Sequence, residues 1–314
     1  MKKLWIYLVA ISVISFGCEQ SAKKEGLKES TEKPSKINKE LKAIDIETLK
    51  SVLGMEGKEQ DGQFKITVPQ NDLNVMVDGI KIIPPMGLGS WVAFAPTSDQ
   101  PMIMGDIVVT EKDLKPVQQE VINQGLTITG IHNHFARMEP DIWYMHIGGM
   151  GDEKKLAGSV KAVFDKITEI RSADPSSAAV STVQNTLDTR MIDSILGYSG
   201  TMNNGVYKTT IGRPDVNLKE HGAPVSTFMG FNIWASWQGT NEKAAVAGDF
   251  AMLENEVEPV TDVLIENGIE VVALHNHMVH ENPRIFFLHY WGVGPAEKLA
   301  RGLREALDKT GVEN

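Results

Sequence analysis

The strongest constraint on the fold is an internal repeat: at an offset of 143 residues, the two halves of the chain align without a gap. The matched blocks include Asp72-Leu73-Asn74 on Asp215-Val216-Asn217, Gly105-Asp106 on Gly248-Asp249, and His132-Asn133-His134 on His275-Asn276-His277. Segments that share residues in this way are expected to share one fold. The repeat therefore predicts two homologous modules, at residues 44–170 and 187–314, joined by a linker at 171–186.

Apolar spacing predicts the elements of one module, and the repeat extends them to the other. Helical spacing predicts helices at 44–53, 111–124 and 152–167, the first two of which end at Gly54 and Gly125. Short β-type runs between turn residues predict strands at 64–68, 80–83, 90–95, 102–109, 126–134 and 141–147. Mostly consecutive strands with a few helices indicate an α+β fold, in which a mostly antiparallel or mixed sheet is covered by helices.

The first 43 residues have the composition of an export segment. Residues 1–17 combine two lysines, an apolar run too short to span a bilayer comfortably, and a small residue before Cys18. Residues 15–18 resemble a bacterial lipobox, so we expect a cleaved signal peptide (1–17) and lipid on Cys18. Residues 18–43 are expected to form a disordered tether. These features predict a lipoprotein anchored in a membrane of the cell envelope, on its periplasmic or extracellular face. The alternative is an uncleaved signal anchor with an unmodified cysteine.

Composition excludes several classes of protein and site. The net charge of −10 argues against nucleic acid as a partner, because phosphate neutralisation requires a basic surplus. The single cysteine rules out an intramolecular disulfide and a thiolate zinc site. The chain contains no nucleophile elbow, no His-Glu-x-x-His, no Walker loop and no dinucleotide-binding glycine motif. Any metal must therefore be held by His, Asp or Glu.

Six of the eight histidines belong to the repeated pattern: His132, His134 and His146 in the first module, and His275, His277 and His289 in the second. Side chains at i and i+2 on a strand project from one face, so each His-Asn-His pair can present two imidazoles to one point. If the antiparallel register places His146 opposite His132, a third imidazole joins them. Three imidazoles around an open position are typical of catalytic zinc, which predicts one divalent metal site in each module. Zinc is the first choice, although other divalent ions also accept imidazole. The alternative is that these histidines are only packed and hydrogen-bonded.

Polar residues retained in both halves supply further candidates. Asp106 and Asp249 are candidate catalytic residues, as metal ligands or general bases. A second set is a candidate for binding a polar substrate, with turn capping as the alternative role: Asp72, Asn74, Asp215 and Asn217. We expect Trp91 and Trp234 to pack in the core.

The segments HNHFARMEPDIWYMHIGGMGDEKKLA and HNHMVHENPRIFFLHYWGVGPAEKLA resemble the LppY/LpqO family over about residues 44–312. The resemblance implies an exported protein, often a lipoprotein, built from a repeated domain of unknown function, and it implies no reaction. The hypothesis from the sequence is thus a lipid-anchored protein with duplicated metal sites, acting as a hydrolase or lyase on a small molecule or glycan. The alternatives are a non-catalytic metal- or ligand-binding lipoprotein and a structural envelope protein.

Overall fold

The computed structural model of the protein describes residues 40–172 and 182–312. These residues belong to one compact unit, Lys39–Asn314. The predicted signal peptide, Cys18, nearly all of the tether and part of the linker lie outside these residues. Within the described part of the chain, no helix combines the length and apolar character needed to cross a membrane.

The first module is built on a six-stranded antiparallel sheet. Its order is β1 (Lys58–Gln60), β2 (Gln63–Pro69), β5 (Gly89–Ala95), β6 (Met102–Thr110), β9 (Ile142–Met150) and β7 (Thr127–His132). A small sheet is formed by β4 (Ile80–Ile82), β3 (Val75–Val77) and β8 (Met138–Glu139), and a 3-10 turn, η1 (Pro84–Met86), follows β4. The helices are α1 (Ile46–Leu53), α2 (Glu111–Asn123) and α3 (Glu153–Ser172).

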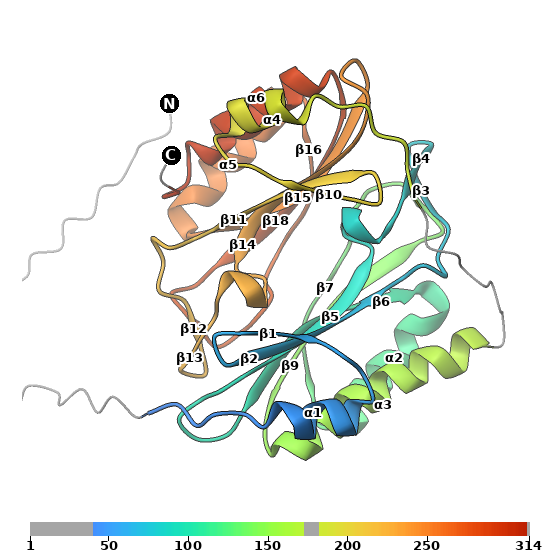
Figure 1. Cartoon of the computed structure of the whole chain (residues 1–314), viewed down its shortest axis with the longest axis vertical. Helices are drawn as coiled ribbons and strands as arrows, with labels where there is room; N and C mark the ends of the chain where they lie inside the picture. Colours follow the sequence, from blue (N-terminus) through green and yellow to red (C-terminus); the bar gives the residue numbers. More distant parts are fainter. Residues whose placement is uncertain (1–39, 173–181, 313–314) are drawn as a thin grey trace, which may run out of the picture. The chain divides into compact units, whose positions relative to one another are not determined.

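The second module repeats this architecture. Its large sheet has the order β10 (Thr201–Asn203), β11 (Val206–Gly212), β14 (Asn232–Gly239), β15 (Ala244–Met252), β18 (Phe286–Gly294) and β16 (Glu270–His275). Its small sheet is β13 (Ala223–Pro224), β12 (Lys219–Glu220) and β17 (Glu281–Asn282), with η2 (Thr227–Met229) after β13. The helices are α4 (Thr189–Leu196), α5 (Glu254–Glu266) and α6 (Ala296–Leu307). The predicted α+β class with two tandem modules is confirmed (Figure 1).

Local sequence signals explain the helix ends. Asp45 caps α1 by accepting a hydrogen bond from the Thr48 amide, and Gly54 ends the helix with a left-handed φ of 66°. Thr110 and Asp113 form a capping box at the start of α2. The short strands β1, β3 and β8 were not predicted, because two or three residues are too few to show a period of two.

The central strands of each large sheet are buried on both faces, as β6 illustrates. Ile103 and Ile107 lie in the core under the helices α1–α3, whereas Met104 and Val108 lie in two clusters shared with the second module. This two-sided burial explains why β6 is an almost continuous apolar run. The alternation also places Asp106 on the inner face, away from the helices.

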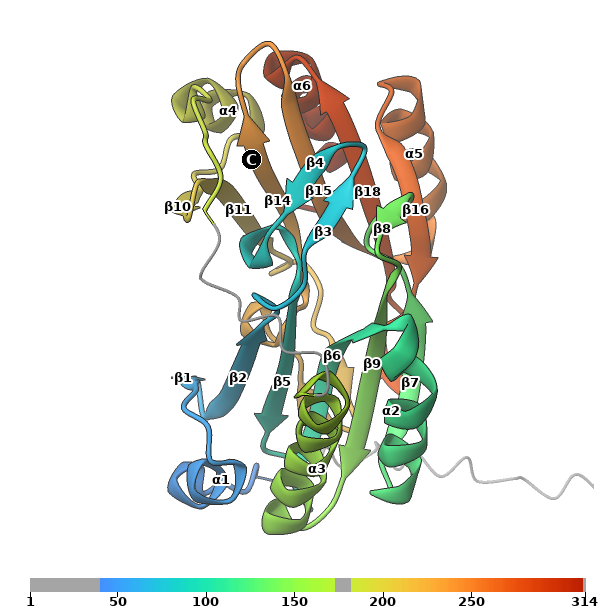
Figure 2. The same ribbon diagram turned by 90° about the vertical axis from the view of Figure 1, so that its right-hand side faces the viewer.

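The two modules hold each other together through exchanged small sheets. Val77 and Ile82 of the first small sheet pack in one cluster with Ala245 and Ala247 of β15. In return, Leu218 and Val225, next to the second small sheet, pack with Ala93 and Met104 of the first large sheet. Figure 2 shows β3 and β4 lying against the second large sheet. Because each inner face is covered by the other module, the two modules bury a common interior.

A buried guanidinium occupies equivalent places in the two modules, although it comes from different positions. In the second module Arg213 binds Glu256, Asp215 and the Ala251 carbonyl. In the first module Arg171, at the end of α3, binds the corresponding groups. These are the carboxylates of Asp113 and Asp72 and the carbonyl of Val108. Both modules therefore retain this ion-pair network, although the arginine lies at different positions of the repeat.

Candidate metal centre

The loop after β7 and the strand β9 position the histidines of the first module. His132 is the last residue of β7, and His134 lies beyond it in a bend rather than on the predicted strand. The register places Tyr144 opposite His132, and His146 opposite Gly130, so His146 is two residues away from the direct pairing with His132 that was considered from the sequence. A shift of two residues preserves the face of a strand, so His146 still projects to the same side as His132.

The six imidazoles converge on one region between the modules. The closest ring pairs each join one module to the other: His132 and His275 have centroids 3.8 Å apart, His134 and His289 3.9 Å, and His146 and His277 4.0 Å. His275 is half-buried and the other five are buried. The prediction of one separate site per module is therefore replaced by a single composite cluster, because the inner faces of the two sheets meet.

Three groups of side chains in this cluster have ligand atoms within 4.8 Å of one another and could hold a metal ion. They are His132, His146 and His275; His132, His134 and His289; and Asp249, His275 and His277. Two of the three groups take ligands from both modules, and together the groups use all six predicted histidines. Neutral imidazole nitrogen and carboxylate oxygen form a donor set that suits zinc and other divalent transition metals.

Backbone carbonyls fix the orientation of three imidazoles. The Nδ1 of His134 lies 3.1 Å from the Gly87 carbonyl oxygen, that of His146 3.3 Å from Gly105 O, and that of His289 3.1 Å from Gly248 O. A carbonyl only accepts hydrogen bonds, so each Nδ1 carries the proton and each Nε2 presents a lone pair. Hydrogen bonds of this kind orient metal-binding histidines in proteins.

Several Nε2 atoms of the cluster lie close to carboxylates or to each other. His134 Nε2 lies 3.5 Å from a carboxylate oxygen of Asp106, and His277 Nε2 lies 3.6 Å from Asp249 and 3.1 Å from His275 Nε2. Among the described residues, the Nε2 atoms of His146 and His289 have no hydrogen-bond partner. Acceptors that face each other in a buried site require a proton or a cation between them.

Burial sets the protonation of these groups. It lowers the pKa of His134 to about 3 and lowers the pKa of His132, with repulsion from neighbouring imidazoles adding to the effect. Burial raises the pKa of Asp106, and it raises the pKa of Asp249 to about 8. The imidazoles are therefore neutral near pH 7, which is the form that binds a metal.

The middle asparagine of the second His-Asn-His motif has a structural role. Asn276 Nδ2 donates to the Thr129 carbonyl at 2.7 Å, and Thr129 Oγ1 donates to the His277 carbonyl at 2.7 Å. These bonds tie the strand β7 to the segment after β16. They hold the two motifs side by side and so bring the imidazoles of both modules together.

A family model described as Domain of Unknown Function (DUF1259) matches the chain twice, at residues 47–166 and 190–309. The chain belongs to this family. The two matches confirm the tandem repeat, and each DUF1259 copy contains one His-Asn-His motif and its later histidine. No curated protein sequence matches the chain.

Two solved structures show distant similarity to this DUF1259 chain. One is an unknown protein from Galdieria sulphuraria, with 10% identity over 68% of this chain and 95% of that chain, and a TM-score of 0.18. The other is a fused permuted hexameric shell protein from the RMM microcompartment, with 12% identity over 78% of this chain and 94% of that chain, and a TM-score of 0.16. At these scores neither structure informs the fold or the function.

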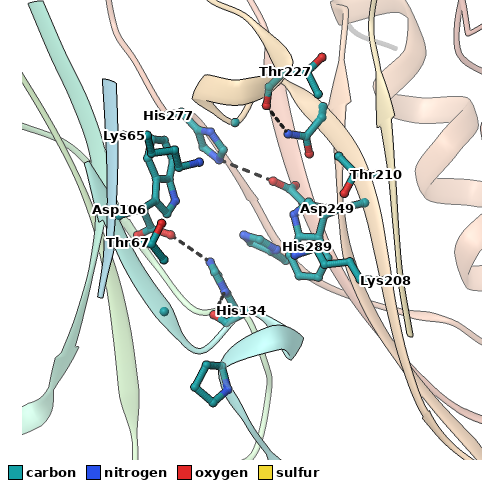
Figure 3. Close-up of a pocket in the computed structure, with 17 residues that line it drawn as sticks. Lys65, Thr67, Asp106, His134, Lys208, Thr210, Thr227, Asp249, His277 and His289 are labelled. Carbon is teal, nitrogen blue, oxygen red and sulfur yellow. Dashed lines mark hydrogen bonds and ion pairs between the residues drawn. The ribbon is translucent and has the colours of Figure 1, made fainter. Parts of the chain in front are cut away.

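A cavity of about 340 Å³ opens beside the histidine cluster, between the inner faces of the two DUF1259 copies. Figure 3 shows Asp106 with His134 and Asp249 with His277 in its wall. Most of the lining consists of pairs at the 143-residue offset: Lys65 and Lys208, Thr67 and Thr210, Gly87 and Gly230, Trp91 and Trp234, Asp106 and Asp249, and His134 and His277. The cavity is therefore built symmetrically from both copies.

The structure places several sequence candidates differently from expectation. Asp72 and Asp215 form ion pairs with Arg171 and Arg213 rather than lining this cavity, and Asn74 and Asn217 are exposed outside it. The tryptophans of the repeat are half-buried in the cavity wall instead of lying fully in the core. Sequence reasoning missed the lysines at 65 and 208, although their retention at the repeat offset was a signal that could have identified them.

Proposed function

We propose that this protein binds a divalent metal, zinc first, in one composite centre shared by its two modules, and that the loaded centre performs hydrolysis or lyase-type chemistry on an envelope or extracellular small molecule or glycan. One observation carries the proposal: the Nδ1 atoms of His134, His146 and His289 are tied to backbone carbonyls, which leaves their Nε2 lone pairs for ligation, and each of the three belongs to a possible ligand group that also contains His132. Such preorganised imidazoles from two modules are well suited to ligation and leave acceptors unpaired without a cation.

The residues of the cluster divide into two roles. The imidazoles hold the ion, together with Asp249, which belongs to one of the three ligand groups. A divalent ion held there would polarise a substrate oxygen or acidify a bound water. Asp106 lies beside His134 but outside these groups, so we assign it the role of general base, which takes a proton from the attacking group or the substrate.

The number of imidazoles favours a second candidate function, metal capture without catalysis. A catalytic zinc site usually has three protein ligands and an open position, whereas this cluster offers six histidines. Cobalt substitution distinguishes the two functions. If azide changes the visible spectrum of the cobalt-loaded protein, the ion has an open position and catalysis is favoured. An unchanged spectrum favours a closed centre with a storage role.

We also propose that the mature protein is anchored in the cell envelope through lipid on Cys18, with residues 18–43 as a tether. The support comes from the export signal, the lipobox-like residues 15–18 and the resemblance to the LppY/LpqO family. Incorporation of labelled palmitate into the wild-type protein, and its loss in Cys18→Ser, tests this anchor. Incorporation into the serine variant would contradict it.

Metal analysis tests the centre directly. After reconstitution with zinc and removal of excess ion, the purified protein should retain about one to two equivalents. The variant His134→Gln/His289→Gln should retain much less, and the control His221→Gln, which lies outside the three ligand groups, should match wild type. Metal at background in the reconstituted wild-type protein would refute the proposal.

A further inference from the structure

We infer that the cavity beside the histidine cluster binds an oxyanion of the substrate, a carboxylate or phosphate group, between the ammonium groups of Lys65 and Lys208. The inference deepens the proposed function and rests on it, because it names the substrate class of the same centre. It starts from two lysines that line one cavity from equivalent strands, β2 and β11.

Both lysines are held in place by a tryptophan ring, and Lys65 is also held by a backbone carbonyl. Lys65 Nζ lies 4.1 Å from the ring centre of Trp91 and donates to the Phe228 carbonyl at 3.0 Å. Lys208 Nζ lies 3.9 Å from the ring centre of Trp234. These cation–π contacts orient each ammonium group without neutralising its charge.

Each tryptophan ring packs closely against a glycine of the opposite module. A Cβ on Gly230 would lie 3.1 Å from the indole of Trp91, and a Cβ on Gly87 would lie 3.1 Å from the indole of Trp234. The two indoles thus fill the space that side chains would need at these positions. The lysines are positioned before a ligand arrives, which reduces the entropic cost of binding.

Asp106 and Asp249 attract Lys65 and Lys208 across the cavity, but they do not pair with them directly. Within the described ranges, no carboxylate lies within ion-pair distance of either ammonium group. The two carboxylates in the wall, Asp106 and Asp249, instead face His134 and His277 at 3.5 and 3.6 Å. When the centre holds a divalent ion, that ion adds two positive charges beside the two ammonium groups and Asp249 is drawn to it as a ligand, so the cavity has an excess of positive charge for a ligand of negative charge.

The environment of the lysines supports the same conclusion. Both ammonium groups belong to residues that line the same cavity, and burial, with repulsion from Lys208, lowers the pKa of Lys65 to about 8. Burial also lowers the pKa of Lys208 to about 8. An oxyanion bound between the two ammonium groups would offset both their loss of hydration and their mutual repulsion. The hydroxyl groups of Thr67 and Thr210, which line the same cavity, provide further hydrogen-bond donors.

The size of the cavity restricts the ligand. Its volume of about 340 Å³ is at the lower end of small-molecule sites, which usually span about 300–1,000 Å³. The ligand is therefore a small carboxylate or phosphate ester, or the charged end group of a larger molecule, whose reacting bond meets the metal centre.

Isothermal titration calorimetry of the zinc-reconstituted full-length protein tests the inference, with inorganic phosphate and malonate as probes and glucose as the neutral control. We expect binding of at least one anion and none of glucose. Lys65→Met and Lys208→Met should each weaken anion binding about 10- to 100-fold, because a hydrogen bond to a charged group contributes about 1.5–3 kcal/mol. Lys298→Met, on the exposed face of α6, should have no effect.

Two further measurements keep the outcomes separate. The double variant Lys65→Arg/Lys208→Arg retains both charges and should bind the anion more tightly than Lys65→Met/Lys208→Met. This comparison separates a loss of anion binding from a loss of folding. Metal analysis of the same samples decides the proposed function independently, since calorimetry reports anion binding at any metal content. Absence of anion binding in the wild-type protein, or equal binding by the double methionine variant, would overturn the inference.

Discussion

Substitutions in either module should disable the same metal centre. His132 belongs to two of the three ligand groups, and one of these also contains His275 from the other module. Zinc binds to four-ligand structural sites with about 10–16 kcal/mol, which is about 2.5–4 kcal/mol per ligand. We therefore expect His132→Gln to lower zinc affinity about 100- to 1,000-fold, and His275→Gln to act similarly, although they lie in different repeats.

The double variant distinguishes a shared centre from two independent ones. In a shared centre, the free-energy effects of His132→Gln and His275→Gln are coupled, because their rings lie 3.8 Å apart, and the double variant loses less affinity than the sum of the single losses. Competition with a chelator of known affinity, followed by metal analysis, measures these changes. His280→Gln is the matched control, since it is exposed and outside the ligand groups.

One pattern of results would refute the shared centre. If each single variant loses half of the bound zinc, the remaining half binds with wild-type affinity, and the double variant loses all of it, then each module carries its own site. The cross-module arrangement of the imidazoles would then have no functional meaning for metal binding.

Three further predictions concern stability, measured by urea unfolding. Gly248→Ala should destabilise the protein by more than about 2 kcal/mol, because its Cβ would lie 2.1 Å from a backbone oxygen, whereas Gly158→Ala, with open space in α3, should stabilise it by about 0.5–1 kcal/mol. Equal effects would contradict this reasoning. Arg213→Met should cost about 3–5 kcal/mol, since it leaves the buried Glu256 carboxylate without its partner, and a loss below about 1 kcal/mol would show that the pair is unimportant. Burial and a neighbouring carboxylate raise the pKa of Glu220 from 4.5 to about 7, so the folded state holds this proton more tightly and stability falls as pH rises from about 4.5 to 7. Glu220→Gln should therefore stabilise the protein by about 1–3 kcal/mol more at pH 8 than at pH 5, and a gain independent of pH would contradict the assignment.

Local features of the fold could be predicted from the residues alone. The helix that ends at Gly54 and the capping residues of α2 depend on contacts within a few positions of the chain, so their patterns indicate them directly. The repeat offset similarly indicates two copies of one α+β architecture. It also singled out six histidines, and all six belong to the groups that could hold a metal.

The site itself depends on contacts that a local pattern cannot encode. The bend that carries His134 and the register that pairs His132 with Tyr144 follow from how β7 and β9 meet, and a sequence fixes the face of a strand more readily than its exact partner. The lysines at 65 and 208 matched at the repeat offset, but only the opposed sheets show that they line one cavity.

The chain therefore encodes two homologous modules and their metal-binding side chains in its local pattern and its repeat. Tertiary structure decides that these side chains form one centre instead of two. The physical reason is that each module leaves apolar surface uncovered on the inner face of its sheet, and burial of this surface requires the small sheet of the other module. This mutual burial brings the imidazoles of both repeats into contact, over separations in sequence that no local pattern spans.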